Sequence, residues 1–225
     1  MKINSIYESM IRTAELVPNN NIKLIIRHSI RPSIIDPNCS YAVKLSKEGK
    51  LLAEFFGKNI EFGLGNLCSS DVPRCIQTLQ SMLKARNEIK DIIINKEILN
   101  EVFIKDHELC KNTFINEGKM KIIIQKLSMN MELPGFFTLA ESVKKMLDYI
   151  FLIGNENNKL DIFCTHDFHI ALLYSALFCE ESSVDIDNLR ANWPMMLEGM
   201  FLWGNRNDFY SGWRGNIKHF KNFLV

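Results

Sequence analysis

The sequence has 225 residues, of which 47% are hydrophobic and 24% are charged, and its 27 basic and 26 acidic residues give a formal net charge of +1. These values are ordinary for one soluble globular domain and argue against a nucleic-acid-binding protein, which would carry a large basic excess. The longest apolar run is too short to cross a membrane, and the amphipathic N-terminus does not resemble a signal peptide. The six scattered cysteines are typical of reduced thiols. We therefore expect a cytoplasmic protein with no nucleic-acid or membrane partner.

The first half of the chain predicts helices and strands in alternation. Ser46 is expected to cap the second helix, which buries Leu52, Phe55, Phe56 and Ile60. The predicted segments are a helix over 3–16, a strand over 23–27, a loop over 32–44, a helix over 46–62, a strand over 66–70 and a helix over 71–89.

The second half continues the alternation and ends in a hairpin. The segment 102–137 is less regular and is expected to hold one short helix and a Pro-Gly turn. The other predicted segments are a strand over 92–99, a helix over 138–153, a strand over 160–167, an apolar helix over 168–180 and a hairpin over 195–213.

Strands separated by helices predict an α/β fold with helices on both faces of a mostly parallel sheet. We expect a three-layer α/β/α sandwich with an antiparallel C-terminal hairpin or edge strand. No linker composition interrupts the chain, so we expect one domain over residues 1–225, with a possible small cap or insertion at 102–137.

Basic side chains gather where three predicted strands end. The first strand ends in Arg27 and His28, and Arg31 comes three residues later. Arg74 lies in the first turn of the helix after the second strand, and His166 ends the fourth strand. Ligands of such sheets bind beyond the carboxyl ends of the strands. Like charges repel, so this arrangement predicts that an anion, most simply a phosphate group, binds among these side chains.

Four segments resemble the motifs of the histidine phosphatase superfamily, in the family's order. "LIIRHSIRP" is similar to the Arg-His-Gly turn after the family's first strand, and "LSKEGKLLAEFFG" to the segment that follows it. "CSSDVPRCIQT" and "FCTHDFHIALL" resemble the arginine helix start and the second-histidine motif. Ser29 stands where the family has glycine. The resemblance implies a phosphoglycerate mutase-like fold.

The resemblance also implies roles for the residues at the strand ends. His28 would attack phosphorus and become a phosphohistidine, which is covalent catalysis. Fixed positive charge would stabilise the transferring group without any metal or cofactor. The residues implied to hold the phosphate oxygens are Arg27, Arg31, Arg74, Thr165 and His166.

The proton donor is open between two carboxyl groups. Asp167 lies beside His166, as in the acid-phosphatase-like branch of the family. Glu101 follows the third strand, as in the mutase-like branch. We favour Asp167, because its position in the chain fixes it close to His166.

These observations predict a metal-independent phosphatase that hydrolyses a small phosphomonoester. One alternative is a phosphoglycerate mutase-like phosphotransferase, which would hold the phosphohistidine until a second acceptor arrives. A second alternative is a protein that binds a phosphorylated ligand without turnover. The sequence specifies neither the substrate nor the oligomeric state.

Overall fold

The computed structural model describes residues 7–18, 21–36, 39–154, 158–179 and 185–223. None of the helices in these ranges is long and apolar enough to cross a membrane. The elements in chain order are α1 (Glu8–Leu16), β1 (Ile22–Arg27), α2 (Lys47–Lys58), β2 (Gly63–Ser69), α3 (Pro73–Arg86), β3 (Ile92–Ile94), α4 (Lys96–Leu99), α5 (His107–Glu117), α6 (Met120–Ser128), α7 (Leu139–Leu152), β4 (Lys159–Thr165), α8 (Asp167–Phe178), α9 (Ile186–Ala191), β5 (Gly199–Asn205), β6 (Asp208–Trp213) and β7 (Asn216–Lys221).

The strands form one sheet in the order β3-β2-β4-β1-β5-β6-β7. The first four in this order run parallel, and β5, β6 and β7 are antiparallel. This confirms the predicted α/β fold and adds β7 to the expected hairpin. The register sets Arg27 opposite Thr165 and Ser69 opposite Cys164. The carboxyl ends of β1, β2 and β4 therefore meet at one edge.

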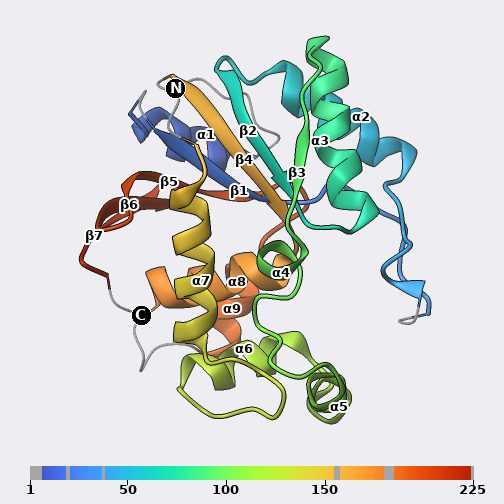
Figure 1. The fold of residues 1–225 in the computed structure, drawn as a ribbon, viewed down its shortest axis with the longest axis vertical. Helices are drawn as coiled ribbons and strands as arrows, with labels where there is room; N and C mark the ends of the chain where they lie inside the picture. Colours follow the sequence, from blue (N-terminus) through green and yellow to red (C-terminus); the bar gives the residue numbers. More distant parts are fainter. Residues whose placement is uncertain (1–6, 19–20, 37–38, 155–157, 180–184, 224–225) are drawn as a thin grey trace.

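Two hydrophobic cores lie on opposite faces of the sheet. Leu24 and Ile26 of β1 pack with buried residues of α1, α2 and α3. Ile25, between them in sequence, packs on the other face with buried residues of α5, α6, α7 and α8. Strand side chains alternate between faces, so a strand buried on both sides reads as continuously apolar. Figure 1 shows α2 and α3 together on one side, with α5 and α6 at the far end of the other layer.

The start of α2 lies directly against the turn after β1. Ser46 caps α2 as predicted, because its side chain accepts the backbone N–H of Gly49 at 3.0 Å. A Cβ atom on Gly49 would lie 2.0 Å from the backbone oxygen of Ile30. Glycine is therefore required for this close backbone approach.

The predicted helix over 46–62 is too long, and one of its expected core residues is wrong. The helix ends at Lys58, and Gly63 begins β2 rather than ending the helix. Phe56 is fully buried, whereas Phe55 is 49% exposed. Neighbouring helical residues point about 100° apart, and here Phe56 lies on the buried face of α2 while Phe55 lies beyond its edge.

Other boundaries also differ from the predictions. The strand expected over 92–99 has three residues and turns into α4, where Asn95 caps the helix by accepting the N–H of Ile98. The segment 102–137 holds two helices, α5 and α6, rather than one. The predictions missed the short helix α9. Residues 3–6 of the first predicted helix lie outside the described ranges.

Candidate active site

His28 follows β1 and is held by hydrogen bonds from three elements. It is 2% exposed, and its backbone N–H donates to the carbonyl of Thr165 at 3.0 Å. The next residue, Ser29, donates its N–H to Thr78 Oγ1 at 3.0 Å and its hydroxyl to the Gly49 carbonyl at 2.7 Å. Ser29 has no positive φ. The turn therefore accepts serine in place of the family's glycine and gains one hydrogen bond from its hydroxyl.

The contacts of His28 leave one ring nitrogen free for attack. Nδ1 lies 2.7 Å from the carbonyl oxygen of Ser29. A carbonyl oxygen only accepts, so Nδ1 carries the proton and Nε2 carries the lone pair. Burial lowers the pKa of His28 from 6.5 to about 3. The ring is therefore neutral near pH 7, as a nucleophile must be.

His166 lies beside His28 at the end of β4, where it occupies the N-cap position of α8. The two ring centroids are 5.6 Å apart. Arg74 Nη2 lies 3.4 Å from His166 Nδ1, and Ser70 Oγ lies 3.3 Å from Nε2. Ser70 thus contacts the histidine and does not cap α3, whose N-cap is Val72. The structure brings together the predicted segments around positions 28, 74 and 166.

Three arginines of this cluster have unused donors. The Nε atoms of Arg27, Arg31 and Arg74 are buried and have no hydrogen-bond partner among the described residues. Burial lowers the pKa of Arg74, and the nearby charges of Arg31 and Arg27 lower it further. Burial and Arg27 likewise lower the pKa of Arg31. Buried donors and mutual repulsion are both relieved when an anion binds.

Asp167, the first residue of α8, is the acidic partner of this cluster. Its Oδ2 lies 2.8 Å from Arg27 Nη2 and accepts Trp193 Nε1 at 3.3 Å. Its Oδ1 accepts the backbone N–H of Phe168 at 3.0 Å. Arg27 also donates from Nη1 to the carbonyl of Pro194 at 2.7 Å. Arg27 and Asp167 are therefore held together by the segment before β5.

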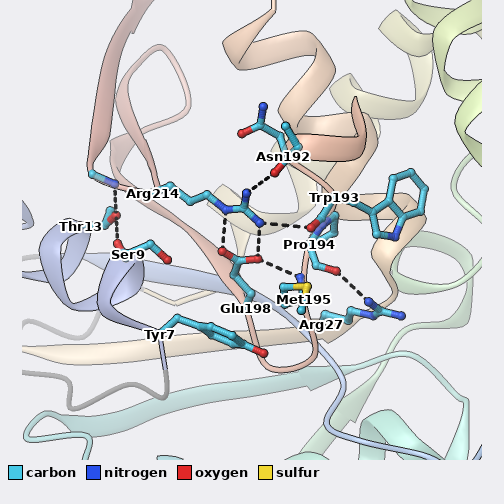
Figure 2. A network of polar contacts seen from close by, with 12 residues as sticks. Tyr7, Ser9, Thr13, Arg27, Asn192, Trp193, Pro194, Met195, Glu198 and Arg214 are labelled. Atoms are coloured by element: carbon cyan, nitrogen blue, oxygen red, sulfur yellow. Dashed lines mark hydrogen bonds and ion pairs between the residues drawn. The ribbon is translucent and has the colours of Figure 1, made fainter. Parts of the chain in front are cut away.

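A buried ion pair fixes that segment, residues 191–198 (Figure 2). Arg214 donates from Nε and Nη2 to the two carboxylate oxygens of Glu198, each at 2.8 Å. Arg214 Nη2 also donates to the Trp193 carbonyl at 3.2 Å, and Glu198 Oε2 accepts the Met195 N–H at 2.8 Å. Bidentate pairs hold a fixed geometry, so this network sets where Trp193 meets Asp167.

Two predicted site residues have their polar groups engaged elsewhere. Glu101 lies 2.9 Å from Lys96 Nζ and 3.8 Å from His107 Nε2, and none of its described polar contacts reaches the two central histidines. The Thr165 hydroxyl donates to the Leu99 carbonyl at 2.7 Å. The side chain of Thr165 therefore anchors α4 to β4, and its backbone carbonyl is what contacts His28.

Several neighbours of the site gave no signal in the sequence. Trp193 donates to Asp167 from a segment without a motif. Cys75 lies in α3 among apolar residues, and its sulfur lies 3.8 Å from His166 Nε2. His169 lies in the first turn of α8, and its ring centroid is 5.8 Å from that of His166. Within the described ranges, no group of three His, Cys, Asp or Glu side chains could hold a metal ion.

Comparisons with known proteins identify the fold. No family model matches the sequence, and no curated protein matches it. Among solved structures, mycobacterial glucosyl-3-phosphoglycerate phosphatase matches with a TM-score of 0.53 and 12% identity, covering 91% of this chain and 100% of that one. Mycobacterial hydrolase 1 matches with a TM-score of 0.54 and 12% identity, covering 91% of this chain and 100% of that one. Phosphoglycerate mutase from Bacillus anthracis matches with a TM-score of 0.50 and 14% identity, covering 92% of this chain and 94% of that one.

The chain therefore has the fold that these hydrolases and phosphoglycerate mutase share, and this confirms the predicted phosphoglycerate mutase-like fold. The similar structures include both a phosphatase and a mutase, so one fold carries more than one reaction among them. At such low identity the likeness establishes the fold, so the assignment of a reaction depends on the site itself.

Proposed function

We propose that this protein is a metal-independent phosphatase that hydrolyses a small phosphomonoester through a phosphohistidine on His28. The observation that carries the proposal is the group of buried Nε donors on Arg27, Arg31 and Arg74. Arg27 directly precedes His28 in the chain, and Arg74 contacts His166, whose ring lies beside that of His28. The imidazole of His28 is neutral, and its Nε2 bears a lone pair. A phosphate dianion supplies both the negative charge and the acceptor oxygens that this arrangement lacks.

In the first step, His28 Nε2 attacks the phosphorus in line with the leaving oxygen. The new N–P bond forms as the P–O bond to the leaving group breaks. The guanidinium groups and the imidazole of His166 stabilise the charge on the equatorial oxygens. Asp167, in its protonated form, gives its proton to the leaving oxygen. The bound phosphate competes for the Arg27 guanidinium, which otherwise pairs with Asp167.

In the second step, water attacks the phosphohistidine. The Asp167 carboxylate takes a proton from this water, a new P–O bond forms and the N–P bond breaks. Inorganic phosphate leaves, and His28 returns to its neutral form with the lone pair on Nε2. The ring can leave as a neutral base because Nδ1 keeps its proton for the Ser29 carbonyl.

The proposal is tested by hydrolysis of para-nitrophenyl phosphate with and without excess chelator. We expect equal rates in both conditions, because the built-in cations take the place of a metal. Loss of activity on chelation would assign the reaction to a metal enzyme. Binding of phosphate without turnover would assign the protein as a phospho-ligand binding protein.

Replacing Asp167 with asparagine identifies the proton donor. We expect Asp167→Asn to lower kcat for an alkyl phosphate by about 100-fold or more, the usual contribution of a general acid. The loss should be smaller for para-nitrophenyl phosphate, because nitrophenolate leaves without a proton. The matched variant Glu101→Gln should change either rate by less than about threefold, since Glu101 pairs with Lys96. The opposite pattern in steady-state kinetics would make Glu101 the donor.

A further inference from the structure

A cavity of about 510 Å³ opens beside Asp167. It lies between the start of α6 and α9, with Trp193 in its wall. The described residues that line it are Lys119, Met120, Lys121, Ile122, Asp167, Ile186, Arg190 and Trp193. This volume suits a small molecule.

The charges around this cavity are strongly unbalanced. Three of the described lining residues are cationic: Lys119, Lys121 and Arg190. The single acidic one, Asp167, already pairs with Arg27. Arg190 contacts Asp187 at 2.8 Å, but that pair is largely exposed and so contributes little. The cavity therefore presents a net positive field.

The start of α6 adds to this field. Lys119 occupies its N-cap position without a side-chain hydrogen bond, and the first turn carries no acidic residue. Lys121 lies one residue into the helix and stacks over the ring of Trp193, 5.1 Å from the centroid. Helix N-termini carry partial positive charge and favour acidic residues, so two lysines there oppose helix stability. An anion in the cavity would offset that cost.

The position of Asp167 connects the cavity to the chemistry. Asp167 lines the cavity and accepts a hydrogen bond from Trp193. In the proposed function, Asp167 protonates the leaving oxygen, so the leaving group contacts Asp167. Because Asp167 also lines this cavity, a leaving group at Asp167 can extend into it, between the indole of Trp193 and the three cations.

We propose that this cavity is a subsite for a leaving group that bears a second anionic group, either a carboxylate or another phosphate. This inference depends on the proposed function and narrows its substrate to phosphomonoesters with an additional negative charge. Lys119, Lys121 and Arg190 bind the second anion, and Trp193 covers the group between the two charges.

The test compares matched substrates with and without a second anionic group. One pair is para-carboxyphenyl phosphate and para-carbamoylphenyl phosphate, and the other is propanediol bisphosphate and hydroxypropyl phosphate. The measurement is the ratio of kcat/KM, anionic over neutral, within each pair. The variants are the double substitution Lys119→Met and Lys121→Met and, as a control, the double substitution Lys50→Met and Lys58→Met. The control removes two exposed cations from α2, on the opposite face of the sheet.

We expect the unmodified protein to prefer the anionic member of at least one pair by about tenfold, as one charge-assisted contact can provide. The double variant at the cavity should reduce that ratio to near one, because it loses the cations that bind the second anion. The control should keep the full ratio. The pair with the larger ratio distinguishes a carboxylate from a phosphate. A ratio that is the same in the unmodified protein and the cavity variant, or a preference for neutral members, overturns the proposal.

A binding measurement separates this proposal from the proposed function. Calorimetric titration of the same compounds into the His28→Asn protein requires no turnover. If the unmodified protein hydrolyses none of the compounds, but the anionic members bind His28→Asn more tightly and this preference is lost when Lys119 and Lys121 are also replaced, the subsite stands and the phosphatase assignment fails. Equal binding of both members overturns the subsite.

Discussion

Replacing His28 with asparagine should lower kcat for any phosphomonoester by at least about a thousandfold, the scale of losing a covalent nucleophile. Asparagine cannot form the N–P bond, but its side-chain amide can still donate to the Ser29 carbonyl that Nδ1 contacts at 2.7 Å. The turn after β1 should therefore persist. Steady-state hydrolysis and rapid-quench trapping of acid-labile phosphoenzyme measure the effect.

The control for this variant is His219→Asn. His219 is the partly exposed histidine of β7 and pairs with Asp208 at 2.6 Å, on the antiparallel side of the sheet. The His219→Asn variant should still hydrolyse the substrate and should still form the trapped phosphoenzyme. Labelled phosphoenzyme that survives in His28→Asn would place the covalent intermediate on another residue and refute the mechanism.

The same variant should also change how stability depends on pH. The pKa of His28 is about 3 when folded, against 6.5 ordinarily, so the unfolded chain binds an extra proton between these values. Folding stability should therefore fall as pH drops through this window, by about 1.4 kcal/mol per pH unit for this group. His28→Asn should lack that contribution. Folding stability of the variant should still fall somewhat as the pH drops, because burial also lowers the pKa of His169.

The sequence predicted the fold well because its periodicity reflects burial directly. Continuous apolar strands and amphipathic helices in alternation fit a parallel core covered on both faces, which the two clusters confirm. The errors fall where local pattern is weak. The helix α9 has six residues, too few for periodicity to emerge. The strand β7 has mostly exposed side chains, so no apolar alternation marks it.

At the site, strand ends were predictable and long-range contacts were not. Arg27 ends the buried strand β1, His28 follows it, and His166 follows β4. The parallel topology alone brings such positions to one edge of the sheet. The contact between Trp193 and Asp167 depends on residues 191–198, whose path is set by the ion pair of Glu198 with Arg214. No local sequence pattern predicts the ion pair between Glu198, which directly precedes β5, and Arg214, which lies in the turn after β6. Thr165 was expected to hold a phosphate oxygen, but its hydroxyl donates to the Leu99 carbonyl at the end of α4.

Lys23 is the residue whose burial the sequence pattern predicts worst. In "IKLII" it reads as an exposed position, yet it is fully buried within β1. Its ammonium group lies 3.1 Å from Asp161 Oδ2 and donates to the Ile153 carbonyl at 2.5 Å. The other oxygen of Asp161 accepts the backbone N–H of Asn66 at 2.7 Å. The pair joins β1, β2, β4 and the end of α7.

Replacing Lys23 with methionine should destabilise the protein by about 3–5 kcal/mol, the cost of leaving a buried charge without its partner. Methionine fills about the same volume as the aliphatic part of the lysine side chain. The loss of stability therefore comes from the unpaired Asp161 carboxylate and not from a cavity. Urea unfolding measures it. In the matched control, Lys144→Met breaks an exposed pair with Asp148, at 2.6 Å, and should cost at most about 0.5 kcal/mol.

The double variant Lys23→Met with Asp161→Asn distinguishes a stranded charge from lost packing. Asparagine removes the charge and keeps an oxygen that can accept the Asn66 N–H. The double variant should therefore be more stable than Lys23→Met alone, because the penalty for a buried ion is gone while the hydrogen bond remains. Domains have a free energy of unfolding of only about 5–15 kcal/mol, so the single variant could fail to fold. In that case, recovery of folding in the double variant is the expected result. A double variant no more stable than the single one would show that the Lys23 stem and its bonds to the end of α7, not the charge balance, hold these elements together.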